Sequence, residues 1–158
     1  MYTKKFQIRW NDLDANQHMG NSKYIEFMSH TRMSFFNEQN LDLETMNSYG
    51  LGPIVLYEQI YYFKEIHLRD TIIVSLEVSG MSKDGRFMTI IHNFYNQEGK
   101  NLAQGEMFFS WLNLQTRKLG IVSEELLLKM KLFPKTKTFK ILTKEDLKKY
   151  HLKPIDLP

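Results

Sequence analysis

Apolar and polar side chains alternate from Phe6 to Trp10, near the start of the chain. A period of two residues is typical of a strand with one buried face. The pattern predicts a strand that ends at Asn11. Residues 12–20 are polar and rich in turn-forming types, so we expect a loop there.

The period changes to that of a helix at Asn21. Apolar side chains then recur every three or four residues, which predicts an amphipathic helix over residues 21–37 with one buried face. Asn21 is a suitable N-cap for it. The expected buried face consists of Tyr24, Phe27, Met28, Thr31 and Phe35.

Between Ile54 and Leu112 the chain has the composition of four long strands. β-branched and aromatic residues dominate, and parts of the segment alternate. Residues 83–85 and 97–99 end in glycine and predict hairpins, so the strands on either side should pair antiparallel. The four expected strands cover residues 54–64, 71–81, 86–96 and 102–112.

Three shorter helices are expected. One begins near Asp42, one covers residues 123–131, and one covers residues 143–150. The last is opened by Thr143 and Asp146, which have the spacing of a capping box.

This order of elements predicts an α+β fold with one long central helix wrapped by a curved, five-stranded antiparallel sheet and followed by short C-terminal helices. We expect one domain over residues 1–131 and a C-terminal extension over residues 132–158, for which the sequence indicates no role. Because one helix covers only part of such a sheet, an edge or face should remain for another subunit. The pattern therefore predicts a homodimer or a homotetramer.

Composition removes several classes of function. The 158 residues include no cysteine, which excludes disulfides, thiolate catalysis and cysteine-ligated metals. There is no apolar run of the length of a signal peptide or a membrane span, so we expect a cytoplasmic protein without a membrane span. The net charge of +3 comes with no basic, aromatic-interleaved stripe, and no nucleic-acid partner is expected.

Ionisable and amide side chains concentrate between Asp12 and Tyr24, just before and at the start of the long helix. Unpaired backbone N–H groups and the helix dipole make a helix N-terminus a suitable site for a developing oxyanion. A carboxylate beside it could attack a carbonyl or activate water. Such residues are also ordinary helix caps, so residue chemistry alone leaves both interpretations open.

Metal binding is the other chemistry to consider in this segment. Its opening resembles a calcium loop, but Gln17 and Lys23 stand where that loop needs Gly and Glu, which excludes calcium. A transition metal held by Asp12, Asp14 and His18 stays open as a minor alternative, and we expect no metal or other cofactor. Motifs of serine hydrolases, P-loop proteins and dinucleotide-binding proteins are absent.

Two blocks of residues resemble the signature of the 4-hydroxybenzoyl-CoA thioesterase-like family of hotdog acyl-CoA thioesterases. The first block resembles a family pattern that consists of Asp-x-Asp, a Gly-His-Val-Asn-Asn-like stretch, a Tyr and an Arg. The second block is similar to the family's Tyr-x-Lys-Pro-Ile-x-x-Gly-Asp stretch. The matching residues of the first block are Asp12, Asp14, His18, Asn21, Tyr24 and Arg32. The second block is Tyr62–Asp70.

The sequence departs from the family pattern at five positions. Gln17 and Arg69 stand where the family often has Gly, Gly20 where it has Asn, Ser29 where it has Glu, and Glu65 where it has Pro. None of these departures removes the aspartate that the family uses. They bear on loop shape and substrate.

The resemblance implies a single hotdog fold and hydrolysis of an acyl-CoA thioester. It implies Asp14 as nucleophile or general base, with His18 orienting it, donating to the leaving thiolate or only satisfying the loop. The backbone N–H groups of Gly20, Asn21 and Ser22 would polarise the carbonyl, although Asn21 could equally be a cap. Tyr24 would line the substrate site as part of the buried helix face.

Two other functions remain open on the same fold. A non-catalytic binding module for acyl-CoA or an acyl carrier would keep the fold without turnover, but the retained Asp14 argues against it. A hydroxyacyl thioester dehydratase would need a histidine over the α- and β-carbons of the substrate, and its motif is not evident.

Overall fold

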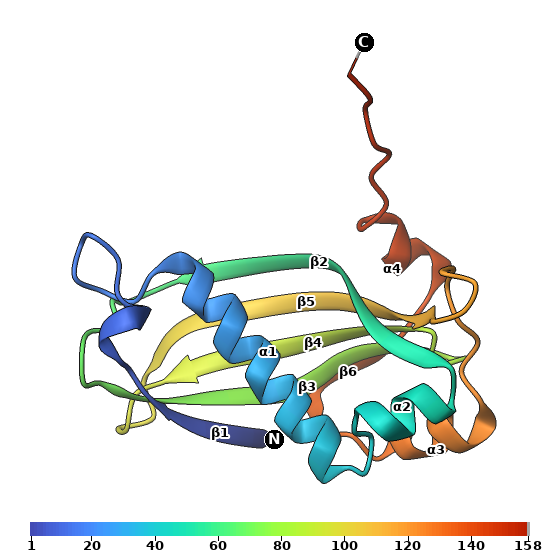
Figure 1. Cartoon of the computed structure of the whole chain (residues 1–158), viewed down its shortest axis with the longest axis horizontal. Coiled ribbons are helices and arrows are strands. Elements are labelled where there is room, and N and C mark those ends of the chain that lie inside the picture. The colour runs from blue at the N-terminus through green and yellow to red at the C-terminus, as the bar shows by residue number, and fades with distance from the viewer. Residues whose placement is uncertain (158) are drawn as a thin grey trace.

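A computed structural model describes residues 1–157, which form one curved sheet with a long helix against its inner face (Figure 1). The helices are α1 (Asn21–Glu38), α2 (Leu43–Ser48), α3 (Glu124–Lys131) and α4 (Lys144–Lys148). The strands are β1 (Tyr2–Gln7), β2 (Leu51–Tyr62), β3 (Thr71–Ser82), β4 (Phe87–Tyr95), β5 (Asn101–Asn113) and β6 (Lys135–Leu142). The α+β hotdog architecture that the sequence predicts is confirmed.

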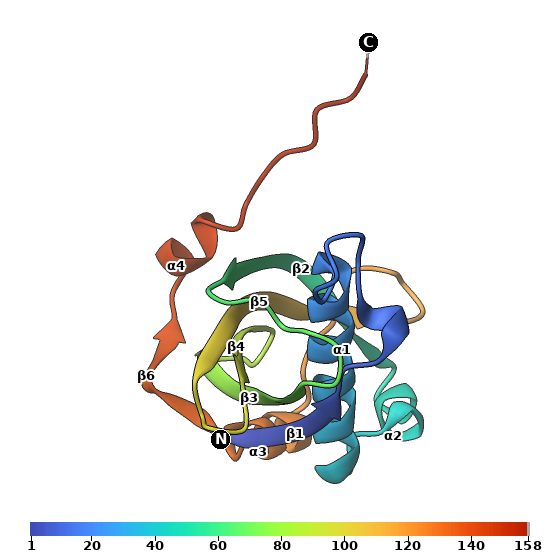
Figure 2. The same cartoon turned by 90° about the vertical axis from the view of Figure 1, so that its left-hand side faces the viewer.

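Five strands form the antiparallel sheet in the order β1-β3-β4-β5-β2. The turns at residues 83–85 and 97–99 join β3 to β4 and β4 to β5, as their glycines predict. In cross-section the sheet is an arc with α1 on its open side (Figure 2). Helix α1 covers the inside of this arc, and among residues 1–157 β2 is an outer edge that pairs only with β5.

A sixth strand, β6, was not expected from the sequence. It runs parallel to β3 and pairs with its second half, from Val78 to Ser82. The reason is that β1 reaches only from Thr71 to Leu76 along β3, which leaves the rest of that edge open. The segment after residue 131 therefore adds a strand to the same sheet, and its status as a separate extension stays a prediction.

The predicted buried face of α1 is present, and Arg32 and Phe36 are buried with it. The helix is one residue longer than expected and begins differently, because Gly20 is the N-cap and Asn21 is the first helical residue. The prediction of Asn21 as N-cap is therefore wrong. Close packing on the sheet depends on Gly105, since a Cβ there would overlap the sulfur of Met28.

The first strand ends at Gln7, earlier than the predicted end at Asn11. The N–H of Ile8 still donates to the carbonyl of Asp70, in register with the β1–β3 pairing, but the N–H of Asp70 donates to His67, so the ladder ends there and residues 10–12 form a 3₁₀ turn. Trp10 is consequently 79% exposed rather than part of a buried strand face. Alternation alone did not reveal this turn.

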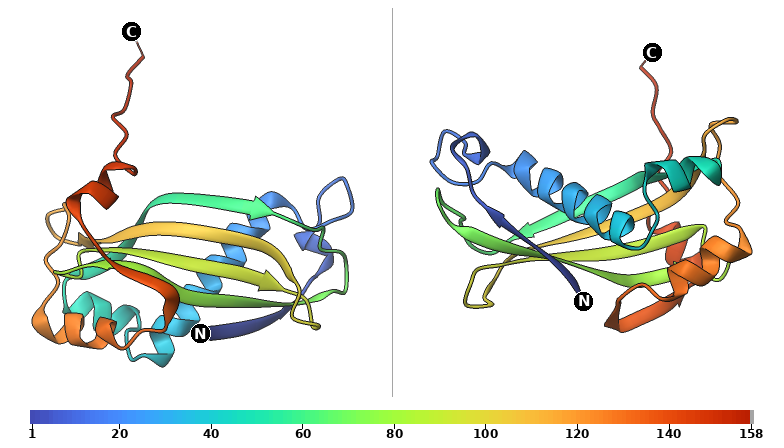
Figure 3. Two further views of the ribbon diagram at one scale, coloured as in Figure 1. Left: turned by 180° about the vertical axis from the view of Figure 1, so that it is seen from behind. Right: turned by 60° about the horizontal axis from the view of Figure 1, so that its bottom comes forward.

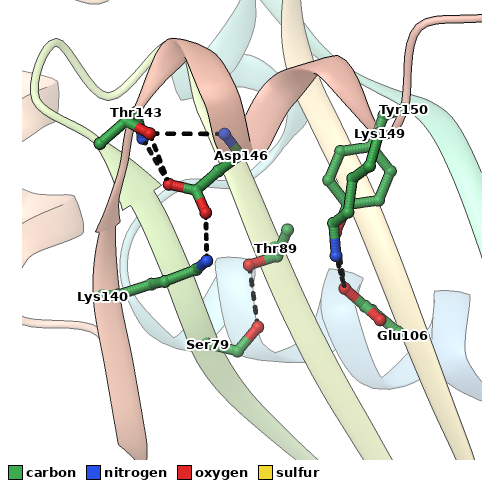
Figure 4. A network of polar contacts seen from close by, with 8 residues as sticks. All are labelled: Ser79, Thr89, Glu106, Lys140, Thr143, Asp146, Lys149 and Tyr150. Carbon is green, nitrogen blue, oxygen red and sulfur yellow. Dashed lines mark hydrogen bonds and ion pairs between the residues drawn. The ribbon is translucent and has the colours of Figure 1, made fainter.

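The C-terminal segment crosses the outer face of the sheet and then leaves the body of the molecule (Figure 3, left). The Tyr150 hydroxyl donates to Glu106 on β5 at 2.6 Å, and its ring stacks on Phe108 at 4.2 Å between centroids. The capping box of Thr143 and Asp146 is present as predicted (Figure 4). These contacts hold α4 against the back of the sheet.

Within residues 1–157, every helix is too short or too polar to cross a bilayer.

Candidate active site

Asp12 closes the loop that precedes α1. Its side chain is fully buried, and its carboxylate accepts hydrogen bonds from the Arg9 N–H at 2.8 Å and from the Arg9 guanidinium at 3.2 Å. Its carbonyl accepts the N–H of Gly20 at 2.9 Å. Burial by itself would raise the pKa of Asp12, but its bonds to Arg9 hold that pKa below the usual value. Asp12 is thus a loop-closing residue that faces away from solvent.

The same loop is joined to the segment between β2 and β3. The N–H of Met19 donates to the carbonyl of Ile66 at 2.7 Å, and the backbones of His18 and His67 form a β-bridge. These contacts bring together the two sequence blocks that carry the family resemblance. The blocks form opposite walls of one site.

Asp14 is oriented differently from Asp12. Its Oδ1 accepts the N–H of Asn16 at 2.8 Å, and its Oδ2 lies 3.5 Å from Nδ1 of His18. The side chain is 35% exposed, so water or a ligand can reach it. Of the two aspartates, Asp14 is therefore the one available for chemistry.

A pocket of about 390 Å³ lies beside the N-terminal end of α1. Four of the predicted site residues line it, namely Asp14, His18, Asn21 and Tyr24, whereas Gly20 and Ser22 do not. The other lining residues are Met19, Tyr62, Phe63, Lys64 and Glu65.

The N-terminus of α1 has no side-chain cap. The N–H of Gly20 donates to Asp12, and the N–H of Ser22 donates to the side chain of Asn21 at 2.9 Å. Within residues 1–157, the N–H of Asn21 donates to no acceptor. A Cβ at Gly20 would meet Asp14 at 3.6 Å, an ordinary contact, so close approach does not demand glycine there. Asn21 is the donor that this helix end leaves for a ligand.

Tyr24 forms an apolar wall of the pocket. Its ring packs edge-on against Tyr62, with centroids 4.9 Å apart. Burial, together with the neighbouring Tyr62 and Asp14, raises the pKa of Tyr24 to about 12. The phenol consequently stays neutral at physiological pH, and its place in the buried helix face is confirmed.

Sequence reasoning did not assign Tyr62, Phe63, Lys64 and Glu65 to the site, although they belong to the second matched block. The match of this block to the family pattern was therefore a signal in the sequence that could have assigned them to the site. Lys64 is notable because Lys100 lies close enough to lower its pKa, through hydrogen bonding and charge repulsion between the two amines. A lysine that lines the pocket and has a second lysine beside it favours an anionic ligand.

A metal ion finds no obvious ligands in this arrangement. Within residues 1–157, no three or more His, Asp or Glu side chains come together in a way that could hold one. Asp12 is the first residue of the possible transition-metal set, and its carboxylate already accepts hydrogen bonds from the Arg9 guanidinium.

The pocket combines an accessible carboxylate, a free helix N–H and an apolar wall on a hotdog fold. These are the groups needed to bind a carbonyl and bring a nucleophile or a water to it. Such groups on such a fold are those expected of a thioester hydrolase. Comparison with known families agrees, because residues 8–140 match the model of the thioesterase-like superfamily, and the chain belongs to that family.

Several individual proteins are similar to this chain. Over 123 residues the chain is 24% identical to the long-chain acyl-CoA thioesterase FadM of Escherichia coli. The aligned region covers 77% of this chain and 91% of FadM. A Staphylococcus aureus protein solved in complex with CoA has a TM-score of 0.77 at 20% identity, covering 99% of this chain and 95% of that one. A probable thioesterase, YbaW of Escherichia coli, has a TM-score of 0.70 at 20% identity, covering 83% and 97%.

Proposed function

We propose that the protein hydrolyses acyl-CoA thioesters and that Asp14 is the catalytic carboxylate. The observation that carries this proposal is the position of the Asp14 carboxylate and of Asn21, with its free N–H, in one pocket. A thioester carbonyl held by that N–H would present its carbon to the carboxylate.

The chemistry follows from this geometry. The Asn21 N–H, at the positive end of α1, stabilises the negative charge that grows on the carbonyl oxygen. Asp14 either attacks the carbonyl carbon to give an anhydride that water then cleaves, or takes a proton from an attacking water. Both routes expel CoA as a thiolate and need an ionised Asp14. His18, 3.5 Å from Asp14, can orient the carboxylate or give a proton to the thiolate.

CoA as the carrier is supported by charge and by similarity. Lys64 lines the pocket beside Lys100, and two amines there can bind the phosphates of the CoA nucleotide. The similar Escherichia coli protein acts on long-chain acyl-CoA, and the similar Staphylococcus aureus protein binds CoA.

A panel of acyl-CoA esters incubated with a thiol reagent tests the proposal. We expect release of free CoA from at least one ester. Hydration of an enoyl ester without free thiol would indicate a dehydratase instead. Tight binding of acyl-CoA with no conversion would indicate a binding module.

We further propose that the protein assembles as a homodimer through β2, or as a tetramer of two such dimers. Strand β2 is an outer edge with unpaired backbone groups, and its side chains include exposed apolar residues. These are Val55, Leu56, Tyr57, Tyr61 and Tyr62. An edge of this kind is a ready surface for pairing with a second copy. Tyr62 also lines the pocket, so a second subunit would lie next to the substrate.

Light scattering tests the assembly. The expected mass is twice or four times that of one chain, and Leu56→Lys should reduce it because a charge on the edge opposes pairing. A wild-type protein that is monomeric and still releases CoA would exclude the dimer while leaving the thioesterase proposal intact.

A further inference from the structure

Tyr24 closes one end of the pocket that contains Asp14. Its side chain is only 4% exposed, yet it lines this pocket together with Tyr62. The ring is held between two others, because its centroid lies 4.9 Å from that of Tyr62 and 5.1 Å from that of Phe94. A ring packed in this way has little room to move aside. Tyr24 is therefore a fixed floor of the Asp14 pocket.

The interior behind Tyr24 is filled with side chains. Met28 follows Tyr24 by one turn on the same face of α1 and is fully buried. Its sulfur rests on β5 at Gly105, where the space is so tight that a Cβ would overlap it. Ile60 of β2 pairs with Gly105 and packs in the same apolar cluster as Tyr24 and Met28. An acyl chain in the Asp14 pocket therefore finds no path past Tyr24 along the helix.

A small cavity lies further along α1 and is separate from the Asp14 pocket. It has a volume of about 170 Å³, and Arg32 of α1 and Met107 of β5 are among its lining residues. The cavity and the pocket share no lining residue. The order along the helix is thus the pocket, the packed side chain of Met28, and the cavity. Only the pocket is available to a substrate that is held at Asp14.

We propose that Tyr24 sets the limit of acyl chain length and that the substrates are short-chain acyl-CoA thioesters. The inference rests on the proposed thioesterase function of the Asp14 pocket. The N–H of Asn21, which would hold the carbonyl, precedes Tyr24 by three residues, or about 4.5 Å of helix. An extended chain advances about 1.2 Å per bond, so this interval corresponds to about four carbons. The open side of the pocket adds a few more, which puts the limit at roughly four to eight carbons.

The limit should be visible in the dependence of kcat/KM on chain length. Carbons up to the limit leave water for an apolar lining made of Met19, Tyr24, Tyr62 and Phe63. Each buried methylene group should raise kcat/KM by about fourfold. A carbon beyond the limit must turn out of the pocket into water, where it gains no binding free energy. The dependence should therefore rise and then break.

The test measures kcat/KM for saturated straight-chain acyl-CoA esters from acetyl-CoA to palmitoyl-CoA, below the concentrations at which they form micelles. We expect a rise of about two- to fourfold per carbon among the shortest esters, and a plateau or a fall beyond roughly eight carbons. A rise that continues at the same rate up to palmitoyl-CoA would overturn the inference. This result needs no variant.

The variant Tyr24→Leu removes the ring but keeps an apolar side chain. The break should move to esters about two to four carbons longer, because roughly 6 Å of helix separates Tyr24 from Met28. Met28→Ala alone should leave the break where it is, since Tyr24 still closes the pocket. The double variant Tyr24→Leu with Met28→Ala should move the break further than Tyr24→Leu does. Thermal unfolding establishes that each variant is folded.

The matched control is Phe35→Leu. It makes a similar aromatic-to-leucine change at a buried position of the same helix, but Phe35 belongs to the other apolar cluster and lines neither the pocket nor the small cavity. The break should stay at the wild-type chain length in this variant.

The possible failures are distinguishable. If the esters release CoA but the break stays in place in folded Tyr24→Leu, another group ends the chain, and the inference is wrong while the thioesterase stands. If Met28→Ala alone moves the break, Tyr24 does not close the pocket and the inference is again wrong. If the wild-type protein cleaves no ester of any length, the proposed function fails and the inference fails with it.

Discussion

Oδ2 of Asp14 and Nδ1 of His18 lie 3.5 Å apart in the loop before α1. The separation is longer than a good hydrogen bond, but catalytic contacts in unliganded sites are often long and shorten when substrate binds. Both side chains line the same pocket. The relationship makes His18 a candidate partner of the carboxylate, and substitution can separate this role from a purely structural one.

His18→Ala should lower kcat by about 10²-fold, the low end of the contribution of a general acid or base. The pH profile of kcat should change with it, because a general acid or base is lost from the site. Steady-state kinetics over a range of pH checks this. Wild-type kinetics in a folded variant would leave His18 with a structural role only.

Asp14→Asn should lower kcat by roughly 10²–10⁴-fold while affinity for a non-hydrolysable acyl-CoA analogue changes little. Asparagine keeps an oxygen for the N–H of Asn16 but lacks the charge that both routes need. Turnover and binding are measured on one folded preparation. The control is Asp42→Asn, an equivalent change at the N-cap of α2, where asparagine still caps. Near-normal turnover of Asp14→Asn would refute the assignment.

Asp12→Asn should act on stability first. The substitution weakens the charge-assisted bonds from Arg9 to a fully buried carboxylate and loosens the loop closure at Gly20. We expect a clear fall in the midpoint of thermal unfolding, with Arg9→Gln giving a fall of similar direction. A variant of Asp12 that keeps wild-type stability but loses all turnover would mean that the roles of the two aspartates are reversed.

Arg69→Gly and Gln17→Gly should each stabilise the protein. Their φ angles are +71° and +65°, in the left-handed region that glycine adopts without strain. Relief of that strain stabilises the folded state, whereas glycine also adds entropy to the unfolded chain. The net effect should raise the free energy of unfolding by roughly 0.5–1 kcal/mol. Urea denaturation measures it. Lys118→Gly, at a loop residue without a positive φ, should destabilise instead.

Stability should fall between about pH 6.5 and pH 3 in part because of His92. Burial and the nearby Arg32 charge lower the pKa of His92 to about 3, whereas in the unfolded chain it is near 6.5. The unfolded state therefore binds a proton first as the pH drops, so the stability present above pH 6.5 is progressively lost. His92→Gln should reduce the slope of unfolding free energy against pH between about pH 7 and pH 5. An unchanged slope would contradict this account.

Much of the fold could be predicted because its signals are local. The three- and four-residue spacing places one face of α1 against the sheet, and the glycine turns at residues 83–85 and 97–99 set two antiparallel pairings. The end of β1 could not be predicted, because it depends on where the pairing with β3 stops, and Ile8 and Asp70 lie far apart in the sequence. For the same reason β6 was missed, since its pairing depends on how far β1 extends along β3.

The candidate site divides in the same way. Asp14, His18, Asn21 and Tyr24 follow from one short segment, and the pocket contains all four. By itself the sequence also determined the order of helices and strands up to residue 131 and the α+β class, because periodicity and turn residues act over a few positions.

Only the tertiary structure decided which aspartate is buried, which backbone N–H is free and which residues meet across the interior. The carboxylate of Asp12 is bound by Arg9, and the N–H of Gly20 donates to the carbonyl of Asp12. Arg32 on α1 forms an ion pair with Glu58 on β2. Each outcome depends on contacts between elements and on competition for hydrogen bonds, which the residue pattern of one segment does not contain.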